Sequence, residues 1–243
     1  MADMKLSDFN LLSFDCYGTL IDWDTGIRTA LQNWYQREGV TESWHEILTL
    51  HGRLEAEQEA ATPSMRYRDV LGEVLKKIGR ELNVRITEDD AQAYGKSIGD
   101  WPAFPDSLVA LQYLKQHFTL VILSNVDRAS FVCTNARLGV EFDYIFTAEE
   151  IGSYKPNEKN FLYMRSKLDN AGFTQDQHLH VAESLYHDHA PAQKLGYKTC
   201  WINRRHETQG SGATLQPGSE PQYNYHFTSL AQLAGVHQRE RER

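Results

Sequence analysis

Short apolar runs alternate with helical patterns along most of the 243-residue chain. The runs 11–14 and 119–123 consist mainly of Leu, Val, Ile and Phe, and 178–182 also reads as a strand, so we expect three buried strands. Leucines three residues apart within 108–114 predict a helix before the second strand. Strands that alternate with helices imply parallel pairing through crossover connections. The pattern therefore predicts an α/β fold with a doubly wound, Rossmann-like parallel sheet.

A long stretch after the first strand shows helical patterns only. Thr87 is followed by three acidic residues, which predicts a helix start with a capping box, and Pro102 marks the return to alternating strands and helices. We therefore expect residues 23–101 to form an all-helical domain inserted into a core made of residues 1–22 and 102–243. Apolar side chains in this stretch fall on one helical face in three groups: Ile27, Leu31 and Trp34; Ile47, Leu48, Leu50 and Leu54; Leu71, Leu75, Ile78 and Leu82.

Polar segments near the end of the chain predict irregular structure. Residues 208–221 are rich in Gly, Ser, Gln and Pro and read as an exposed loop. Residues 237–243 are mostly charged and read as a frayed tail.

Composition excludes several classes of partner. A formal net charge of -8 disfavours nucleic acid, which clustered cations bind. No apolar stretch is long enough to cross a bilayer, and the N-terminus lacks a signal-peptide core, so we expect a cytoplasmic protein without a membrane partner. The three cysteines show no metal-ligand spacing, and their odd number argues against a disulfide framework. We expect Cys16 to pack in the core rather than to react.

Asp15 is the first candidate for chemistry. It follows the strand 11–14 directly, and Gly18 supplies a backbone that can adopt turn geometry. Open α/β sheets bind their ligands at the carboxyl ends of strands, so a carboxylate at this point can act as a nucleophile. Asp after a strand also caps turns and helices, and these residues alone leave both interpretations open.

Residues 15–20, Asp-Cys-Tyr-Gly-Thr-Leu, resemble the first motif of the haloacid dehalogenase superfamily. In the phosphatases of that superfamily, the position of Tyr17 holds an Asp that protonates the leaving alcohol. The L-2-haloacid dehalogenase branch resembles this chain in having Tyr there, because a halide leaves without a proton. The resemblance implies displacement at carbon rather than phosphoryl transfer, and it identifies residues 23–101 as a helical cap.

Three further segments resemble the later motifs and follow in the same order. In the phosphatases, acids near the fourth strand bind magnesium together with the nucleophile. Here Tyr17 replaces one acid and the longer Glu183 replaces another, which weakens an octahedral cage of carboxylates. The resemblance therefore implies a site with no metal and no cofactor. The matching residues are Ser124 with Asn125, Lys155 before Pro156, and Glu183 with Asp188.

The resemblance also implies a mechanism. Asp15 would attack C2 of a small 2-substituted carboxylic acid and form an ester that water then hydrolyses. Lys155 would keep Asp15 ionised, while Glu183 and Asp188 would orient Lys155 or the water. The expected ligand is a small carboxylic acid, and a homodimer is left open as the assembly. The implied catalytic residues are Asp15, Lys155 and Asp188, and the implied substrate-binding residues are Tyr17, Thr19, Ser124, Asn125, Glu183 and Arg53.

Two departures from the dehalogenase pattern leave the leaving group open. Phe161 stands where the branch usually has a Tyr, and Arg53 is the available match for the cap arginine that receives the halide, although a solvated helix position fits it equally well. A related enzyme opens the ring of azetidine-2-carboxylate, with a ring nitrogen as leaving group, and Glu55 or Glu57 could hold such a cation. A phosphatase and a binding protein without catalysis are further alternatives.

Among ten histidines, most are expected at the surface or at helix starts, and only His187 is retained as a candidate near the site.

Overall fold

The computed structural model describes residues 4–207, 210 and 212–242. Its centre is a parallel sheet with the strand order β3-β2-β1-β4-β5-β6. The chain moves outward from β1 to one edge and then returns to build the other half beside it, so the doubly wound α/β fold is confirmed. The strands are β1 (Leu11–Phe14), β2 (Thr119–Ser124), β3 (Tyr144–Thr147), β4 (His178–Ala182), β5 (Lys198–Ile202) and β6 (Tyr225–Phe227).

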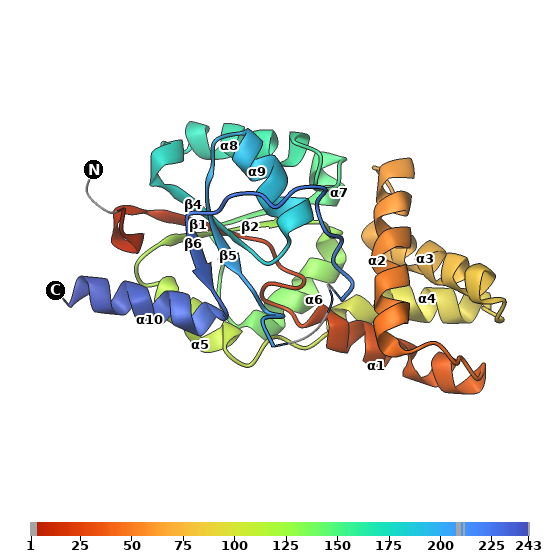
Figure 1. Ribbon diagram of the computed structural model, residues 1–243. Helices are drawn as coiled ribbons and strands as arrows, with labels where there is room; N and C mark the ends of the chain where they lie inside the picture. Colours follow the sequence, from red (N-terminus) through yellow and green to blue (C-terminus); the bar gives the residue numbers. More distant parts are fainter. Residues whose placement is uncertain (1–3, 208–209, 211, 243) are drawn as a thin grey trace.

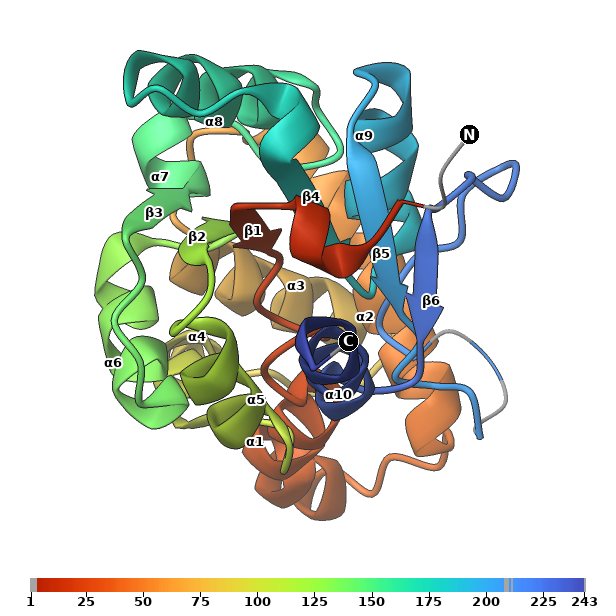
Figure 2. The same cartoon turned by 90° about the vertical axis from the view of Figure 1, so that its left-hand side faces the viewer.

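Helices cover both faces of the sheet, as Figures 1 and 2 show. The helices α8 (Lys159–Asn170) and α9 (Ala190–Lys194) lie on one face, and α5 (Ser107–Leu114) and α10 (Leu230–Arg241) lie on the other. This double cover explains why β1, β2 and β4 read as nearly continuous buried runs. The remaining core elements are η1 (Leu6–Asp8), α6 (Arg128–Leu138), α7 (Ala148–Ile151), η3 (Gln175–Gln177) and the π-helical turn η4 (Leu185–His189).

The described residues between β1 and α5 contain only helices, and these stand beyond the carboxyl ends of the strands (Figure 1). We call them the cap. Thr87 caps one of its helices with the expected capping box, in which its hydroxyl accepts the Asp90 backbone N–H. The exact domain boundaries stay a prediction. The cap contains α1 (Trp23–Arg37), α2 (Trp44–Ala61), α3 (Tyr67–Leu82), α4 (Glu88–Lys96) and η2 (Ser97–Asp100).

The end of the chain differs from the expectation. Residues 230–241 form α10, so the prediction of a frayed tail from residue 237 is wrong within the described residues. His237 is buried against α5, where its Nδ1 lies 2.9 Å from the Tyr113 hydroxyl. The three-residue strand β6 follows the expected loop and extends the sheet past β5. The predicted loop includes residues 208, 209 and 211, which lie outside the described residues, and residues 212–221 contain no helix or strand.

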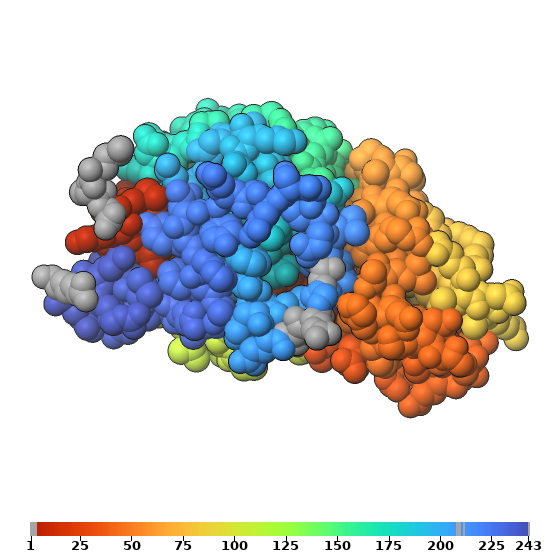
Figure 3. All heavy atoms as spheres, in the orientation of Figure 1, coloured from red at the N-terminus to blue at the C-terminus, as the bar shows by residue number. Residues whose placement is uncertain are grey.

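The segment after β5 also reaches the cap. Figure 3 shows this segment in blue against the orange α2. The contact is close, because a Cβ added to Gly52 of α2 would overlap the Ala213 carbonyl oxygen. None of the described helices has the length and apolar character needed to cross a membrane.

Candidate active site

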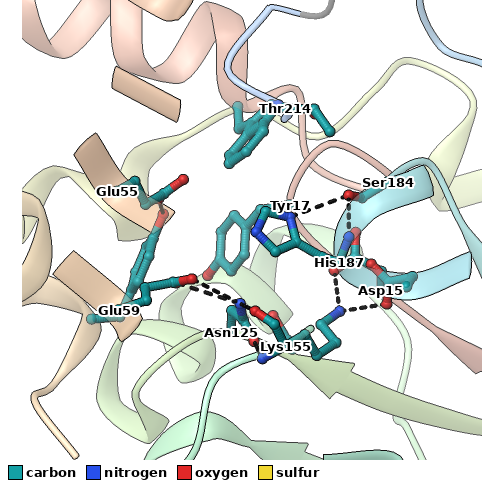
Figure 4. Close-up of a pocket in the computed structure, with 13 residues that line it drawn as sticks. Asp15, Tyr17, Glu55, Glu59, Asn125, Lys155, Ser184, His187 and Thr214 are labelled. Carbon is teal, nitrogen blue, oxygen red and sulfur yellow. Dashed lines mark hydrogen bonds and ion pairs between the residues drawn. The ribbon is translucent and has the colours of Figure 1, made fainter. Parts of the chain in front are cut away.

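A small cavity of about 30 Å³ lies where the carboxyl ends of β1 and β2 meet α2 of the cap. A single water needs about 10–15 Å³ in the same measure, so the cavity admits only a small ligand. Thirteen described residues line it (Figure 4): Asp15, Tyr17, Trp23, Glu55, Glu59, Tyr67, Ser124, Asn125, Lys155, Ser184, His187, Asp188 and Thr214.

Asp15 is held rigidly at the tip of β1. Its backbone N–H donates to the Val181 carbonyl at 3.1 Å, and its Oδ2 accepts the Thr19 hydroxyl at 2.7 Å. Gly18, with φ of +89°, makes the turn that brings Thr19 back to the carboxylate. Thr19 is absent from the cavity lining of the described residues, so its geometry supports Asp15 rather than a direct contact with substrate.

Lys155 supplies the positive charge of the site. Its Nζ donates to Asp15 Oδ1 at 2.8 Å, to Asp188 Oδ1 at 2.7 Å and to the Leu123 carbonyl at 3.0 Å, which uses all three of its hydrogens. Burial disfavours the ammonium, but the two carboxylates outweigh burial and raise the pKa of Lys155. Burial likewise raises the pKa of Asp15, and the Lys155 ammonium opposes that rise.

Asp188 is fixed by two donors on one oxygen. Besides Lys155, the Nε2 of His180 lies 2.9 Å from Asp188 Oδ1. Asp188 Oδ2 is buried and finds no hydrogen-bond partner among the described residues, although the side chain lines the cavity. A carboxylate with one free oxygen beside Asp15 can accept a proton from a water bound in the cavity.

The two residues after β2 have different positions. Ser124 lines the cavity with a buried hydroxyl that has no partner in the described part of the chain. Asn125 has its amide engaged, because Oδ1 accepts the Lys155 backbone N–H at 2.7 Å and Nδ2 donates to the Lys155 carbonyl at 3.0 Å. Asn125 therefore positions Lys155, whereas Ser124 is free to donate to a ligand.

The cap contributes two buried carboxylates. Glu55 accepts a hydrogen bond from the Tyr67 hydroxyl, and Glu59 lies 3.3–3.4 Å from the Asn125 amide nitrogen. Burial raises the pKa of Glu55 to about 7, and burial together with the neighbouring Glu55 raises the pKa of Glu59 well above its usual value. This wall of the cavity is therefore acidic and poorly solvated.

Arg53 does not belong to the cavity. Its guanidinium is 45 % exposed and pairs with Glu57 at 2.9 Å and Glu81 at 2.6 Å on the outside of the cap. The expectation that Arg53 binds substrate does not fit this placement, because on α2 it points away from the face that carries Glu55. The solvated alternative for Arg53 is the one that the structure supports.

Glu183 also points away from the cavity. Its backbone N–H donates to Thr19 Oγ1 at 2.9 Å, while its carboxylate accepts the Thr214 hydroxyl at 3.0 Å and faces neighbouring hollows. Burial raises the pKa of Glu183 to about 8. Glu183 thus braces the Asp15 turn and the Thr214 segment, and a direct contact with substrate is not what its geometry favours.

The donor set does not fit a magnesium ion. The Lys155 ammonium stands between Asp15 and Asp188, the two carboxylates that such an ion would need. The third position is Tyr17, whose hydroxyl shares a 2.8 Å hydrogen bond with Thr134. Over the described residues, no group of three His, Cys, Asp or Glu side chains is arranged to hold a metal.

Several residues of the cavity were not expected from the sequence. Glu59, Tyr67 and Thr214 come from the cap and from the segment after β5, and no motif marks them. The histidine expectation is wrong for His51, His178, His180 and His237, which are buried away from helix starts, whereas His189 is the N-cap of α9. His187, retained as a candidate, does line the cavity. An acidic pair four residues apart, at 55 and 59, was the available signal for the cap wall.

Comparison with known proteins agrees with this fold. The chain is 26% identical over 206 residues to the (S)-2-haloacid dehalogenase of Pseudomonas sp. (strain YL), which covers 79% of this chain and 82% of that protein. The L-2-haloacid dehalogenase of Xanthobacter autotrophicus has the same fold, with a TM-score of 0.78 at 17% identity over 95% of this chain and 98% of that one. A second structure of that enzyme, with chloropropionic acid covalently bound, gives a TM-score of 0.76 at 16% identity over the same shares.

The family model of the haloacid dehalogenase-like hydrolases matches residues 9–181, from the start of β1 into β4. This range includes Asp15, Ser124 and Lys155 and is more than half of the chain. The protein is therefore a hydrolase that belongs to the haloacid dehalogenase-like family.

Proposed function

We propose that the protein hydrolyses a small 2-substituted carboxylic acid by displacement at carbon, as its 2-haloacid dehalogenase relatives act on 2-haloacids. The observation that carries the proposal is the arrangement around Lys155, where one ammonium binds both Asp15 and Asp188 at the cavity. Such an arrangement holds a nucleophile and a base side by side, with no space between them for a second cation.

In the first step, a carboxylate oxygen of Asp15 attacks C2 of the substrate. The bond between C2 and the leaving group breaks, its electron pair departs with the leaving group, and an aspartyl ester remains. Lys155 and the Thr19 hydroxyl keep the attacking carboxylate oriented. Ser124 donates its hydroxyl to the substrate carboxylate at the edge of the cavity.

In the second step, water attacks the carbonyl carbon of the Asp15 ester. Asp188 Oδ2 accepts the proton of this water, and the 2-hydroxy acid leaves as the Asp15 carboxylate re-forms. The proton then passes to solvent, so each turnover consumes one water and releases the leaving group and one proton. The covalently bound chloropropionic acid in the Xanthobacter enzyme supports an intermediate of this kind.

A single-turnover isotope experiment tests the ester. The protein, in molar excess over L-2-chloropropionate, is incubated in ¹⁸O-labelled water with EDTA present. We expect unlabelled lactate and one ¹⁸O in the peptide that contains Asp15, because the product oxygen comes from the protein. Lactate that carries ¹⁸O in the first turnover would show direct attack by water and would refute the ester. Asp15→Asn is the control that should form neither ester nor product.

Ring opening of azetidine-2-carboxylate is the second candidate function. The observation in its favour is the composition of the cavity lining, which among the thirteen described residues contains two cap glutamates and no arginine. A protonated ring nitrogen would stabilise the ionised form of this pair, whose pKa values burial raises, whereas a halide would not. Incubation with azetidine-2-carboxylate, 2-chloropropionate and fluoroacetate, followed by assays for halide and for 4-amino-2-hydroxybutyrate, distinguishes the two.

Phosphatase activity fits the site less well. Tyr17 cannot protonate a leaving alcohol as an Asp does, and its hydroxyl is already bonded to Thr134. Magnesium-dependent release of phosphate from p-nitrophenyl phosphate, abolished in Asp15→Asn, would overturn the assignment to carbon chemistry.

A further inference from the structure

Two carboxylates enter the cavity from one face of α2. Glu55 and Glu59 are four residues apart and therefore lie on the same side of the helix. Both side chains are almost completely buried, with 3% and 4% of the residue exposed. Figure 4 shows them on the cap side of the cavity, opposite Asp15 and His187.

Neither carboxylate has a counter-ion in the described part of the chain. Glu55 accepts from the uncharged Tyr67, and Glu59 faces the uncharged Asn125 amide at 3.3–3.4 Å. The exposed Glu57 of the same helix, by contrast, is paired with Arg53. Lys155 acts on Glu59 only through space, because its three hydrogens bind Asp15, Asp188 and the Leu123 carbonyl. Burial without a paired cation favours the protonated forms of Glu55 and Glu59, so a ligand that brings a positive charge would stabilise their ionised forms.

Hydrogen-bond donors without partners line the opposite side of the same cavity. Ser124 Oγ and His187 Nε2 are both buried and unpartnered among the described residues. The Ser184 hydroxyl accepts the backbone N–H of His187 at 2.9 Å and lies 3.2 Å from its Nδ1. We assign the hydroxyl hydrogen to Nδ1, which leaves the ring proton on Nε2. Burial lowers the pKa of His187 to about 4, so the neutral ring offers one N–H to the cavity.

The cavity thus has donors on its core side and carboxylates on its cap side. We propose that Glu55 and Glu59 bind a protonated nitrogen of the substrate while Ser124 and His187 donate to its carboxylate, so that the enzyme selects 2-substituted carboxylates that also carry an ammonium group. This inference rests on the proposed function and specifies its substrate class.

Two reactions satisfy this charge pattern. In a strained ring, Asp15 attacks the carbon next to both the carboxylate and the nitrogen, the C–N bond breaks, and its electron pair stays on the nitrogen as an amine. The amine takes up the proton that ester hydrolysis releases, so the net change is the addition of one water. In an open-chain substrate, a halide leaves C2 while the ammonium stays on the neighbouring carbon, and one proton is released with the halide.

A pair of matched ligands tests the charge recognition without catalysis. Azetidine-2-carboxylate and cyclobutanecarboxylate share a four-membered ring and a carboxylate and differ in the ring nitrogen. Isothermal titration calorimetry with the inactive Asp15→Asn protein at pH 7.5 measures both. We expect azetidine-2-carboxylate to bind about tenfold more tightly or better, and equal affinities or tighter binding of cyclobutanecarboxylate would overturn the proposal.

Substitutions in the same background assign the preference to the cap pair. Glu59→Gln and Glu55→Gln keep the size of each side chain, and we expect each to reduce the preference for the ring nitrogen by about tenfold. Glu57→Gln is the matched control on the outer face of α2 and should leave the preference unchanged. A preference that survives both Gln variants would show that another group recognises the nitrogen.

An activity comparison separates this inference from the proposed function. The wild-type protein is assayed with 2-chloropropionate and with 3-amino-2-chloropropionate, and the Asp15 ester is followed by intact mass. If both chlorides form the ester with equal kcat/KM, and Glu59→Gln leaves that ratio unchanged, the charge recognition is wrong and the mechanism stands. If no substrate forms an ester while the binding preference holds, the mechanism is wrong and the recognition stands.

Discussion

His180 shows how single residues behind the cavity bear on its chemistry. Ser13 of β1 lies opposite His180 of β4, and its hydroxyl is 2.7 Å from His180 Nδ1 and 2.6 Å from His178 Nε2. Because the Asp188 carboxylate only accepts, His180 must carry its proton on Nε2 and accept the Ser13 hydrogen at Nδ1. His178 then donates to Ser13. The buried chain of donors runs in one direction, toward Asp188.

This direction predicts a role for His180 in positioning the base. In His180→Phe, Asp188 keeps only Lys155 and is free to rotate, so we expect hydrolysis of the ester to slow about tenfold or more and the Asp15 ester to accumulate. Intact mass spectrometry detects the adduct as the mass of the substrate less its leaving group. His180→Gln restores a donor near the same point and should recover part of the rate. A His180→Phe protein that turns over normally without any adduct would contradict this role.

His51 gives a pH dependence of stability. Its ring is completely buried in the cap, where Nε2 lies 2.6 Å from the Tyr94 hydroxyl, and burial lowers the pKa of His51 to about 3. The unfolded chain takes up the proton near pH 6.5, whereas the folded protein does so only near pH 3. The contribution of the neutral His51 ring to the free energy of unfolding is therefore complete above pH 6.5 and is lost as the pH falls from 6.5 toward 3.

Urea unfolding at pH 7.5, 6.5, 5.5 and 4.5 measures this loss. His51→Gln removes the titrating ring, so the decline in unfolding free energy below pH 6.5 should become shallower by about 1.4 kcal/mol per pH unit at most. The exposed His45→Gln on the same helix is the control and should keep the wild-type slope. An unchanged slope in His51→Gln would mean that His51 does not supply this loss.

The sequence predicted well those residues whose position follows from their own strand. Asp15, Ser124 and Lys155 reach the cavity because each follows a strand tip or a motif with fixed geometry relative to the sheet. Glu59 and Thr214 were missed for a physical reason. Their place in the cavity depends on how the cap and the segment after β5 pack on the core, and the spacing of residues within one helix or loop carries no information about that packing.

At the scale of elements, the tail predicted from residue 237 and the unpredicted strand β6 are errors of the same kind, because packing on the core cannot be inferred from residue spacing. The strands β1 and β4 have the predicted bounds because runs buried on both faces are recognisable without their neighbours. The prediction of a tail from residue 237 is wrong because it followed the charge of the last turns of α10, although Leu230, Leu233 and His237 lie on one buried face. The strand β6 has only three residues, which is too short to show an alternation.

Replacement of glycine by alanine is expected to have opposite effects on stability at Gly52 in α2 and at Gly235 in α10. Gly52→Ala places a methyl group against the Ala213 carbonyl oxygen, and we expect a loss of about 1–3 kcal/mol in unfolding free energy. Gly235→Ala in α10 meets only the flexible end of Arg239 at 3.4 Å and should stabilise the protein by up to about 1 kcal/mol. Thermal and urea unfolding check both signs, and a neutral Gly52→Ala would show that the Ala213 segment yields easily.

For the whole molecule, the cavity exists only while the cap lies against the core. Several polar contacts join the two parts near the site, including Glu59 against the Asn125 amide at 3.3–3.4 Å and the ion pair of Arg66 with Glu149 at 3.2 Å. Tyr154 donates its hydroxyl to the Met65 carbonyl at 2.6 Å, and Arg68 donates to the buried Asp127 at 2.7 Å. The cavity of about 30 Å³ is bounded by both parts, so its room for a substrate depends on how the cap lies against the core. The strength of the contacts therefore sets how often the site is accessible.

Arg68→Ala tests this coupling without any substrate. Asp127 keeps its bonds to Ser130, so the core should stay folded while the cap opens more often. Hydrogen–deuterium exchange should then accelerate about fivefold in peptides that cover residues 62–70 and 124–128, since a partly exposed ion pair contributes about 1 kcal/mol, and the sheet should exchange as before. Arg37→Ala removes an ion pair within the cap, to Asp90, and should leave residues 124–128 unchanged. Faster exchange throughout β1 and β4 in Arg68→Ala would instead indicate global destabilisation, and unchanged exchange would show that this ion pair does not hold the cap closed.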